Sequence, residues 1–146
     1  MGNVRNFFTT GQQQLLIDAI REAETETSGE IRLHLDASCD KNVFERALEV
    51  FNNLNMHRTK LQNGVLFYLA IDTRDFVIIG DKGINDLVPE NFWDEVKDLV
   101  ISSFKQGNFI EGLTEGIKCC GSKLKTFFPY QSDDINELVD EISFGD

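Results

Sequence analysis

The run Val65-Leu66-Phe67-Tyr68-Leu69-Ala70-Ile71 decides how this chain folds. An unbroken apolar stretch with β-branched and aromatic members is typical of a strand that is covered on both faces. Only residues 72–75 separate it from a second apolar run, Phe76-Val77-Ile78-Ile79. Because so short a connection cannot make a parallel crossover, the two runs are predicted to form an antiparallel hairpin.

A strand is also predicted upstream of this hairpin, at residues 30–36. Ile31, Leu33 and Leu35 alternate there with the polar residues Arg32, His34 and Asp36. A helix capped by Asn42 lies between this strand and the central one, which is enough chain for a right-handed parallel crossover. The predicted sheet is therefore small and mixed.

Helical periodicity predicts three further helices, at residues 11–28, 90–105 and 108–128. Thr10 with Gln13 is a capping-box pattern for the first of them. Gly112 and Gly116 lie one turn apart in the last helix. Glycine inside a helix costs about 1 kcal/mol relative to alanine, which is easiest to understand if this face packs closely against the sheet or another helix.

The chain has 146 residues, which indicates one domain. We expect an α/β domain over residues 1–129 and an acidic C-terminal tail over residues 130–146. Residues 131–146 hold six of the acids and no base, and they carry Ile135, Leu138, Val139 and Ile142 at helical spacing. The tail is therefore expected either to dock as a short amphipathic helix or to stay mobile and meet a protein partner.

Composition excludes several classes of function. The net charge of −11 argues against a nucleic-acid partner. No apolar run approaches the roughly 18 residues of a membrane span, and the N-terminus has no apolar stretch of signal-peptide length. Three cysteines form no disulfide framework, so we expect a soluble cytoplasmic protein with reduced thiols.

The motifs of the common hydrolases are absent from the sequence, as are phosphate-binding loops and zinc-type spacings. These exclusions leave the carboxylate side chains as the candidate functional groups. The predicted topology gathers Asp36, Asp72 and Asp75 at one end of the sheet, and Glu30 and Asp81 at the other. Asp81, Asn85 and Asp86 also supply oxygen atoms within one glycine-containing loop. Calcium and magnesium prefer such oxygen ligands, so either end is a candidate cation site.

The first of these ends also carries basic residues. Arg74 lies between Asp72 and Asp75, and Lys105 is expected nearby. Arg74 and Lys105 would attract a phosphate group, whereas the aspartates would attract a metal ion. The alternative interpretation is a charged turn whose acids and bases neutralise one another.

Three blocks of sequence, taken in order, resemble the TPM domain family. They are residues 59–70, the segment Ile78-Ile79-Gly80-Asp81-Lys82-Gly83-Ile84, and Phe104-Lys105 followed by Gly107-Asn108, Gly112 and Gly116-Ile117. Ser28-Gly29-Glu30-Ile31-Arg32 and Phe92-Trp93 are similar to the soluble bacterial branch of the family.

The resemblance implies a Rossmann-like three-layer α/β/α sandwich. It also implies acid phosphatase activity and calcium binding, which are assigned to plant members, whereas bacterial members have no settled function. The resemblance is densest at the end of the sheet with Glu30, Asp81 and Asp86, so we place the predicted metal site there first.

The leading hypothesis is a small domain that binds calcium or magnesium through carboxylates at an edge of the sheet. A metal-assisted phosphatase is the alternative, in which the cation polarises a phosphoryl oxygen and a carboxylate orients water. A protein-interaction module that uses the acidic tail is the third hypothesis.

Overall fold

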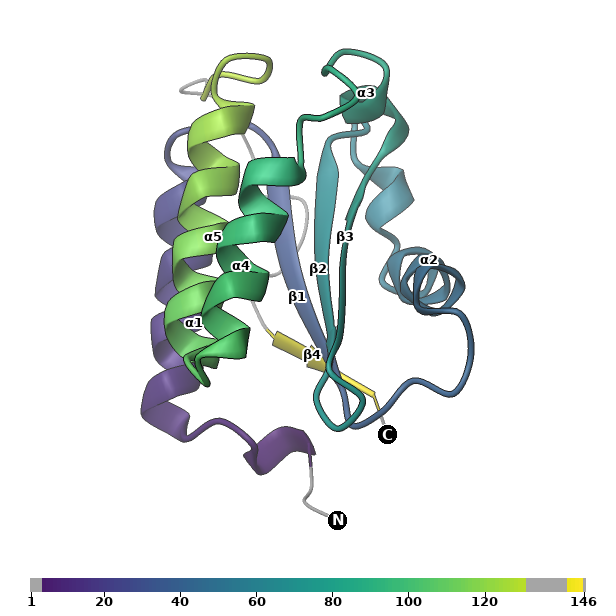
Figure 1. Ribbon diagram of the computed structural model, residues 1–146. Coiled ribbons are helices and arrows are strands. Elements are labelled where there is room, and N and C mark those ends of the chain that lie inside the picture. The colour runs from purple at the N-terminus through teal and green to yellow at the C-terminus, as the bar shows by residue number, and fades with distance from the viewer. Residues whose placement is uncertain (1–3, 131–141, 146) are drawn as a thin grey trace.

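The computed structural model describes residues 4–130 and 142–145. Within them, one four-stranded sheet has the strand order β3-β2-β1-β4 (Figure 1). The strands are β1 (Glu30–Asp36), β2 (Gly64–Ala70), β3 (Asp75–Gly80) and β4 (Ile142–Phe144). The α-helices are α1 (Thr10–Glu24), α2 (Val43–Asn53), α3 (Lys82–Asn85), α4 (Asp94–Lys105) and α5 (Phe109–Leu124), with 3-10 turns at η1 (Val4–Asn6) and η2 (Met56–Arg58).

The pairing of the strands confirms the predicted mixed sheet. β1 runs parallel to β2, with Leu33 opposite Phe67, and β2 runs antiparallel to β3, with Phe67 opposite Ile78. The strand β2 is buried along its whole length, as its uninterrupted apolar run indicates. The hairpin between β2 and β3 is therefore antiparallel, and the crossover through α2 joins parallel strands, as predicted.

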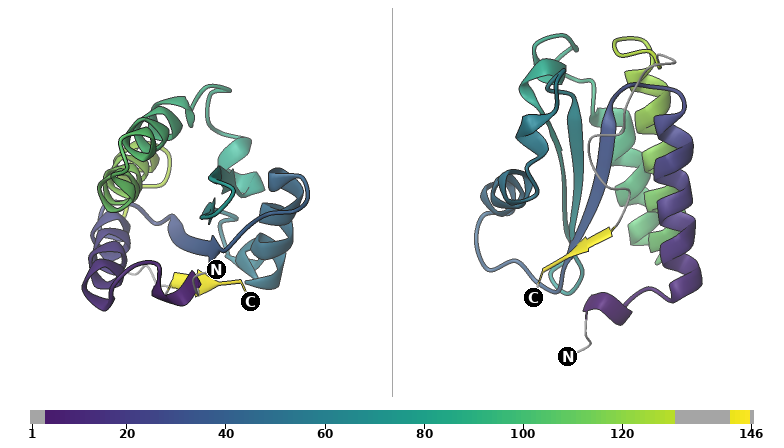
Figure 2. Two further views of the ribbon diagram at one scale, coloured as in Figure 1. Left: turned by 60° about the horizontal axis from the view of Figure 1, so that its bottom comes forward. Right: turned by 180° about the vertical axis from the view of Figure 1, so that it is seen from behind.

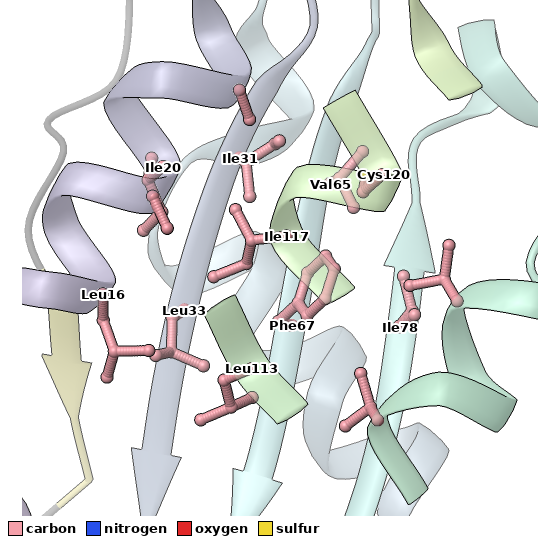
Figure 3. Packing of buried hydrophobic residues seen from close by; sticks show 14 of the residues in the cluster. Leu16, Ile20, Ile31, Leu33, Val65, Phe67, Ile78, Leu113, Ile117 and Cys120 are labelled. Carbon is pink, nitrogen blue, oxygen red and sulfur yellow. The ribbon is translucent and has the colours of Figure 1, made fainter. Parts of the chain in front are cut away.

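Helices cover both faces of the sheet, which gives the predicted three-layer α/β/α sandwich. Figures 1 and 2 show α1, α4 and α5 on one face and α2 on the other. The larger core lies under the three helices, where Leu33, Phe67 and Ile117 are fully buried (Figure 3). A smaller core, with Phe51, Met56 and Tyr68, lies under α2.

The glycine face of α5 packs closely against its neighbours, as predicted. A Cβ atom at Gly116 would overlap the Val100 side chain of α4, and one at Gly112 would lie 2.8 Å from the Cβ atom of Ser103. Further along, a Cβ at Gly121 would lie 2.7 Å from that of Ala23 on α1. The glycines thus let α5 lie close to both α4 and α1.

Several predicted boundaries are corrected by the structure. The capping box of α1 is formed by Thr9 with Gln12, one residue before the predicted pair. The helix α4 begins at Asp94 instead of residue 90, because residues 90–93 form turns. Asp81 caps the short helix α3, so the segment expected as a loop contains one helical turn.

The end of the chain also differs from the expected helix. Ile142 begins β4, which pairs in parallel with β1, so that Leu33 lies opposite Ile142. The edge of a sheet exposes unpaired N–H and C=O groups, and β4 covers this edge of β1 along Leu33–Leu35. The other predicted positions of the tail helix, Ile135, Leu138 and Val139, lie outside the described residues.

Candidate functional site

Two loops are joined at the end of the sheet where β1 and β2 finish. One loop, residues 37–42, leads from β1 to α2, and the other, residues 71–74, turns from β2 into β3 (Figure 1). The Asp72 N–H donates to the Ala37 carbonyl at 2.6 Å, and the Cys39 N–H donates to the Thr73 hydroxyl at 3.3 Å. We call residues 37–42 and 71–74 the joined loops.

Asp36, the last residue of β1, is held by three side chains beneath these loops. One carboxylate oxygen lies 2.8 Å from His34 Nε2, and the other accepts from the Tyr68 hydroxyl at 2.5 Å. Arg46 on α2 donates to both oxygens, from Nε at 2.8 Å and from Nη2 at 3.3 Å. Burial acts to raise the pKa of Asp36, but the bonds from His34, Arg46 and Tyr68 outweigh it and hold that pKa well below its usual range.

The predicted metal ligand Asp36 therefore already has protein donors on both of its oxygens. A cation bound directly to this carboxylate would have to displace Arg46, whose side chain lies between α2 and the sheet. Through these bonds the Asp36 carboxylate links the end of β1 to Arg46 of α2 and Tyr68 of β2.

The network around Asp36 extends to the C-terminal strand. His34 Nδ1 lies 2.8 Å from the Ser143 hydroxyl on β4, and the His34 ring stacks on Tyr68 with 5.8 Å between centroids. Burial and the neighbouring Asp36 raise the pKa of the Tyr68 hydroxyl, which stays protonated. Gly145 packs so closely against Asp36 that a Cβ atom there would overlap the carboxylate.

Sequence reasoning missed this network, although part of its signal was visible. His34 and Asp36 are two residues apart, so they share the face of β1 that was predicted to be the more polar one. The spacing gave no sign that this face is buried, nor that Arg46, Tyr68 and Ser143 converge on it.

A cavity of about 310 Å³ opens beside the joined loops. It is lined by residues 36–41 together with Arg46, Glu49 and Gly145. Glu49 is neutralised by Lys41 at 2.6 Å and by Arg46 at 3.1 Å, and both bases lower its pKa. Asp40 is exposed and has no such partner within the described residues.

The other two acids predicted at this end are also present without basic partners. Asp72 is exposed in the joined loops, and Asp75 begins β3 directly opposite Ala70, whose other neighbour is Asp36. Neither side chain makes an ion pair or hydrogen bond within residues 4–130 and 142–145. This end of the sheet therefore carries carboxylates with free oxygen atoms.

The opposite end of the sheet does not bring its predicted ligands to one point. Glu30 is buried and lies opposite Gly64, whose carbonyl accepts from the Asp81 N–H on the other side. Asp81 caps α3 through Oδ1, at 2.7 Å from the Lys82 N–H, while its buried Oδ2 has no partner among the described residues. Asp86 is exposed and paired with Lys82 at 2.6 Å.

The predicted phosphate-binding residues do come together. Arg74 and Lys105 line one cavity of about 370 Å³, together with Asp75.

No group of three His, Cys, Asp or Glu side chains in the described part of the chain is placed to hold a metal ion. None of the described helices is both long and apolar enough to cross a membrane.

Comparison with known families decides which family this fold represents. The family model of the TPM domain matches residues 3–122, which is most of the chain. The chain belongs to the TPM domain family. The resemblance seen in the three sequence blocks is thereby confirmed. No curated protein matches this TPM domain.

Solved structures share the architecture. This TPM domain is similar to the BA42 protein of the psychrophilic bacterium Bizionia argentinensis, with 50% identity, a TM-score of 0.93, and 99% and 100% of the two chains covered. An N-terminal domain from P. gingivalis shares 21% identity with a TM-score of 0.70, covering 86% of this chain and 83% of that one. An N-terminal domain from Corynebacterium glutamicum, at 9% identity, has a TM-score of 0.63 with 93% and 80% covered. The last two show the fold alone.

Proposed function

We propose that this TPM domain binds divalent cations, calcium or magnesium, through carboxylates of the joined loops and the adjoining strand. The observation that supports the proposal is the surroundings of the Asp40, Asp72 and Asp75 side chains. None of the three has a basic partner within the described residues, whereas Asp36, Glu49 and Asp86 are each neutralised by arginine or lysine.

The chemistry of these groups suits hard cations. Carboxylate oxygens without a basic partner gain favourable electrostatic energy when a cation binds to them. Because no three acidic side chains are preassembled in the described residues, main-chain carbonyls and water would supply the remaining ligands. Calcium accepts such irregular oxygen shells more readily than magnesium, so the affinity for calcium should be the higher of the two.

The opposite end of the sheet is a less favourable location. Asp86 is engaged with Lys82, and Glu30 is buried at a strand position. Asp81 keeps one buried oxygen without a described partner, which is why a binding experiment should observe both ends.

The test is a calcium titration of metal-free protein, followed through backbone amide shifts in potassium chloride near physiological ionic strength. We expect saturable shifts at residues 37–42 and 71–75, and magnesium should compete. Asp72→Asn should weaken binding, whereas Asp98→Asn, an exposed acid on α4, should not. Absence of saturation would refute the proposal, and saturation confined to residues 80–86 would refute its location.

Metal-assisted phosphatase activity is the second candidate function, and the meeting of Arg74 with Lys105 favours it. These two bases would hold a phosphate, the cation would polarise a phosphoryl oxygen, and a carboxylate would orient the attacking water. It ranks lower because the residues that line this cavity include no serine, threonine, cysteine or histidine. Calcium- or magnesium-dependent turnover of an aryl phosphate that is lost in Asp72→Asn would support it, and turnover unaffected by chelation would contradict it.

A further inference from the structure

The cavity at Arg74 and Lys105 has apolar walls that neither proposed function uses. It lies beside β3, an edge strand of the sheet, and is closed by α4 and the start of α5. The apolar residues that line it are Val43, Phe76, Ile101, Phe104 and Phe109. The charged ones, Arg74, Asp75 and Lys105, are the only others.

Three of the lining side chains are phenylalanines whose rings pack against one another. Phe104 contacts Phe76 edge to face, with 5.7 Å between centroids, and lies 4.9 Å from Phe109. Phe76 in turn packs edge to face on Phe67, with 6.0 Å between ring centroids. Phe67 lies on β2 and is completely buried. The three lining rings are only partly buried, so a preformed aromatic surface faces the cavity.

Among the described residues, the two bases of the cavity lack the acidic partners that several other cations of this acidic domain have. Lys41, Lys82 and Lys123 each pair with a carboxylate. Arg74 and Lys105 are exposed and make no ion pair within the described residues. With Asp75 counted, the lining of the cavity carries a net charge of about +1 in a chain of net charge −11, so it attracts an anion locally.

We propose that this cavity binds a small aromatic anion. The ring of the ligand packs against Phe76, Phe104 and Phe109, and its acidic group lies between Arg74 and Lys105. Each part of the cavity argues for one part of the ligand: a neutral apolar molecule would leave both bases without a partner, and a free inorganic anion would leave the phenyl surface in water. The volume of about 370 Å³ is in the range of small-molecule sites.

Phenylphosphonate is a suitable probe because its carbon–phosphorus bond keeps hydrolysis out of the measurement. Metal-free protein is titrated with it, and amide shifts of residues 74–76 and 101–109 are followed. We expect saturable binding that is about tenfold tighter than that of inorganic phosphate or of benzyl alcohol, each of which supplies half of the ligand. If inorganic phosphate binds as tightly as phenylphosphonate, charge attraction alone explains the binding. If benzyl alcohol binds as tightly, the cavity recognises only the apolar ring. Either result overturns the proposal, and so does a titration with phenylphosphonate that does not saturate.

Lys105→Gln tests the anion contact without disturbing the core, because this side chain is exposed at the end of α4. It should weaken phenylphosphonate several-fold and leave benzyl alcohol unchanged. Lys97→Gln, on the same helix but away from the cavity, is the matched control and should change neither. An unchanged affinity of Lys105→Gln for phenylphosphonate would contradict the proposal. Because no metal is present, the outcome is independent of whether the joined loops bind cations.

Discussion

Replacing Asp36 with asparagine tests whether the buried network under the joined loops stabilises the domain. The carboxylate is 7% exposed and receives bonds from His34, Tyr68 and Arg46. Removing one partner of a buried ion pair costs about 3 to 5 kcal/mol. Since the Arg46 side chain is 27% exposed and water can replace part of its interaction, we expect the lower limit, about 3 kcal/mol.

Urea or thermal denaturation followed by circular dichroism at pH 7 measures this loss. For a chain of this length, the expected drop in the melting temperature is roughly 6 to 12 °C. Asp98→Asn on the surface of α4 is the control and should change the stability by less than about 0.5 kcal/mol. A loss below about 1 kcal/mol for Asp36→Asn would refute the reasoning, because the network would then contribute no more than a surface ion pair.

The pH dependence supplies a second measurement on the same variant. The folded state holds the pKa of Asp36 below its ordinary value of 3.8, so the unfolded chain takes up a proton at this position before the folded chain does. The stabilisation is therefore complete above about pH 5 and declines as the pH falls through 3.8. The difference in stability between the wild type and Asp36→Asn should narrow below pH 4, and a difference that widens there would contradict the assignment.

Two further predictions concern close contacts of glycines. Gly116→Ala should destabilise the domain in thermal melts, because overlap with Val100 costs about 1 to 3 kcal/mol and exceeds the helix-propensity gain of about 1 kcal/mol. Gly11→Ala, where the nearest atom is 4.0 Å away, should stabilise it; stabilisation by both changes would contradict the close packing of α5. In Gly145→Ala, the added Cβ atom should overlap Asp36. The backbone amide of residue 145, which bonds to the Leu35 carbonyl of β1, should then exchange its hydrogen faster. Unchanged exchange would show that β4 adapts to the added atom.

The sheet topology was accessible from sequence because it follows from local patterns and connection lengths. The apolar run of β2 and the four-residue turn before Phe76 leave only an antiparallel hairpin, which the structure contains. β4 was not accessible, since three residues, Ile142–Phe144, show no period of their own. Their conformation is set by β1, whose open edge they cover.

The candidate site was predicted in part. The sequence placed Asp36, Asp72 and Asp75 at one end of the sheet, because the carboxyl ends of parallel strands and the start of the returning strand must meet there. It also brought Arg74 near Lys105, which line one cavity. It gave no means of telling a carboxylate with free oxygen atoms from one already bound by a base.

The sequence by itself thus determined the order of the elements, the mixed sheet and the family, because periodicity and chain length act over short distances along the chain. Only the tertiary structure decided which charges remain available. Arg46 and Ser143 come from distant segments to saturate the network of Asp36, whereas Asp40 and Asp72 are left without basic partners in the described residues. The physical reason is that a buried charge must be satisfied by whatever packs over it, and that partner is set by the fold rather than by neighbours in sequence.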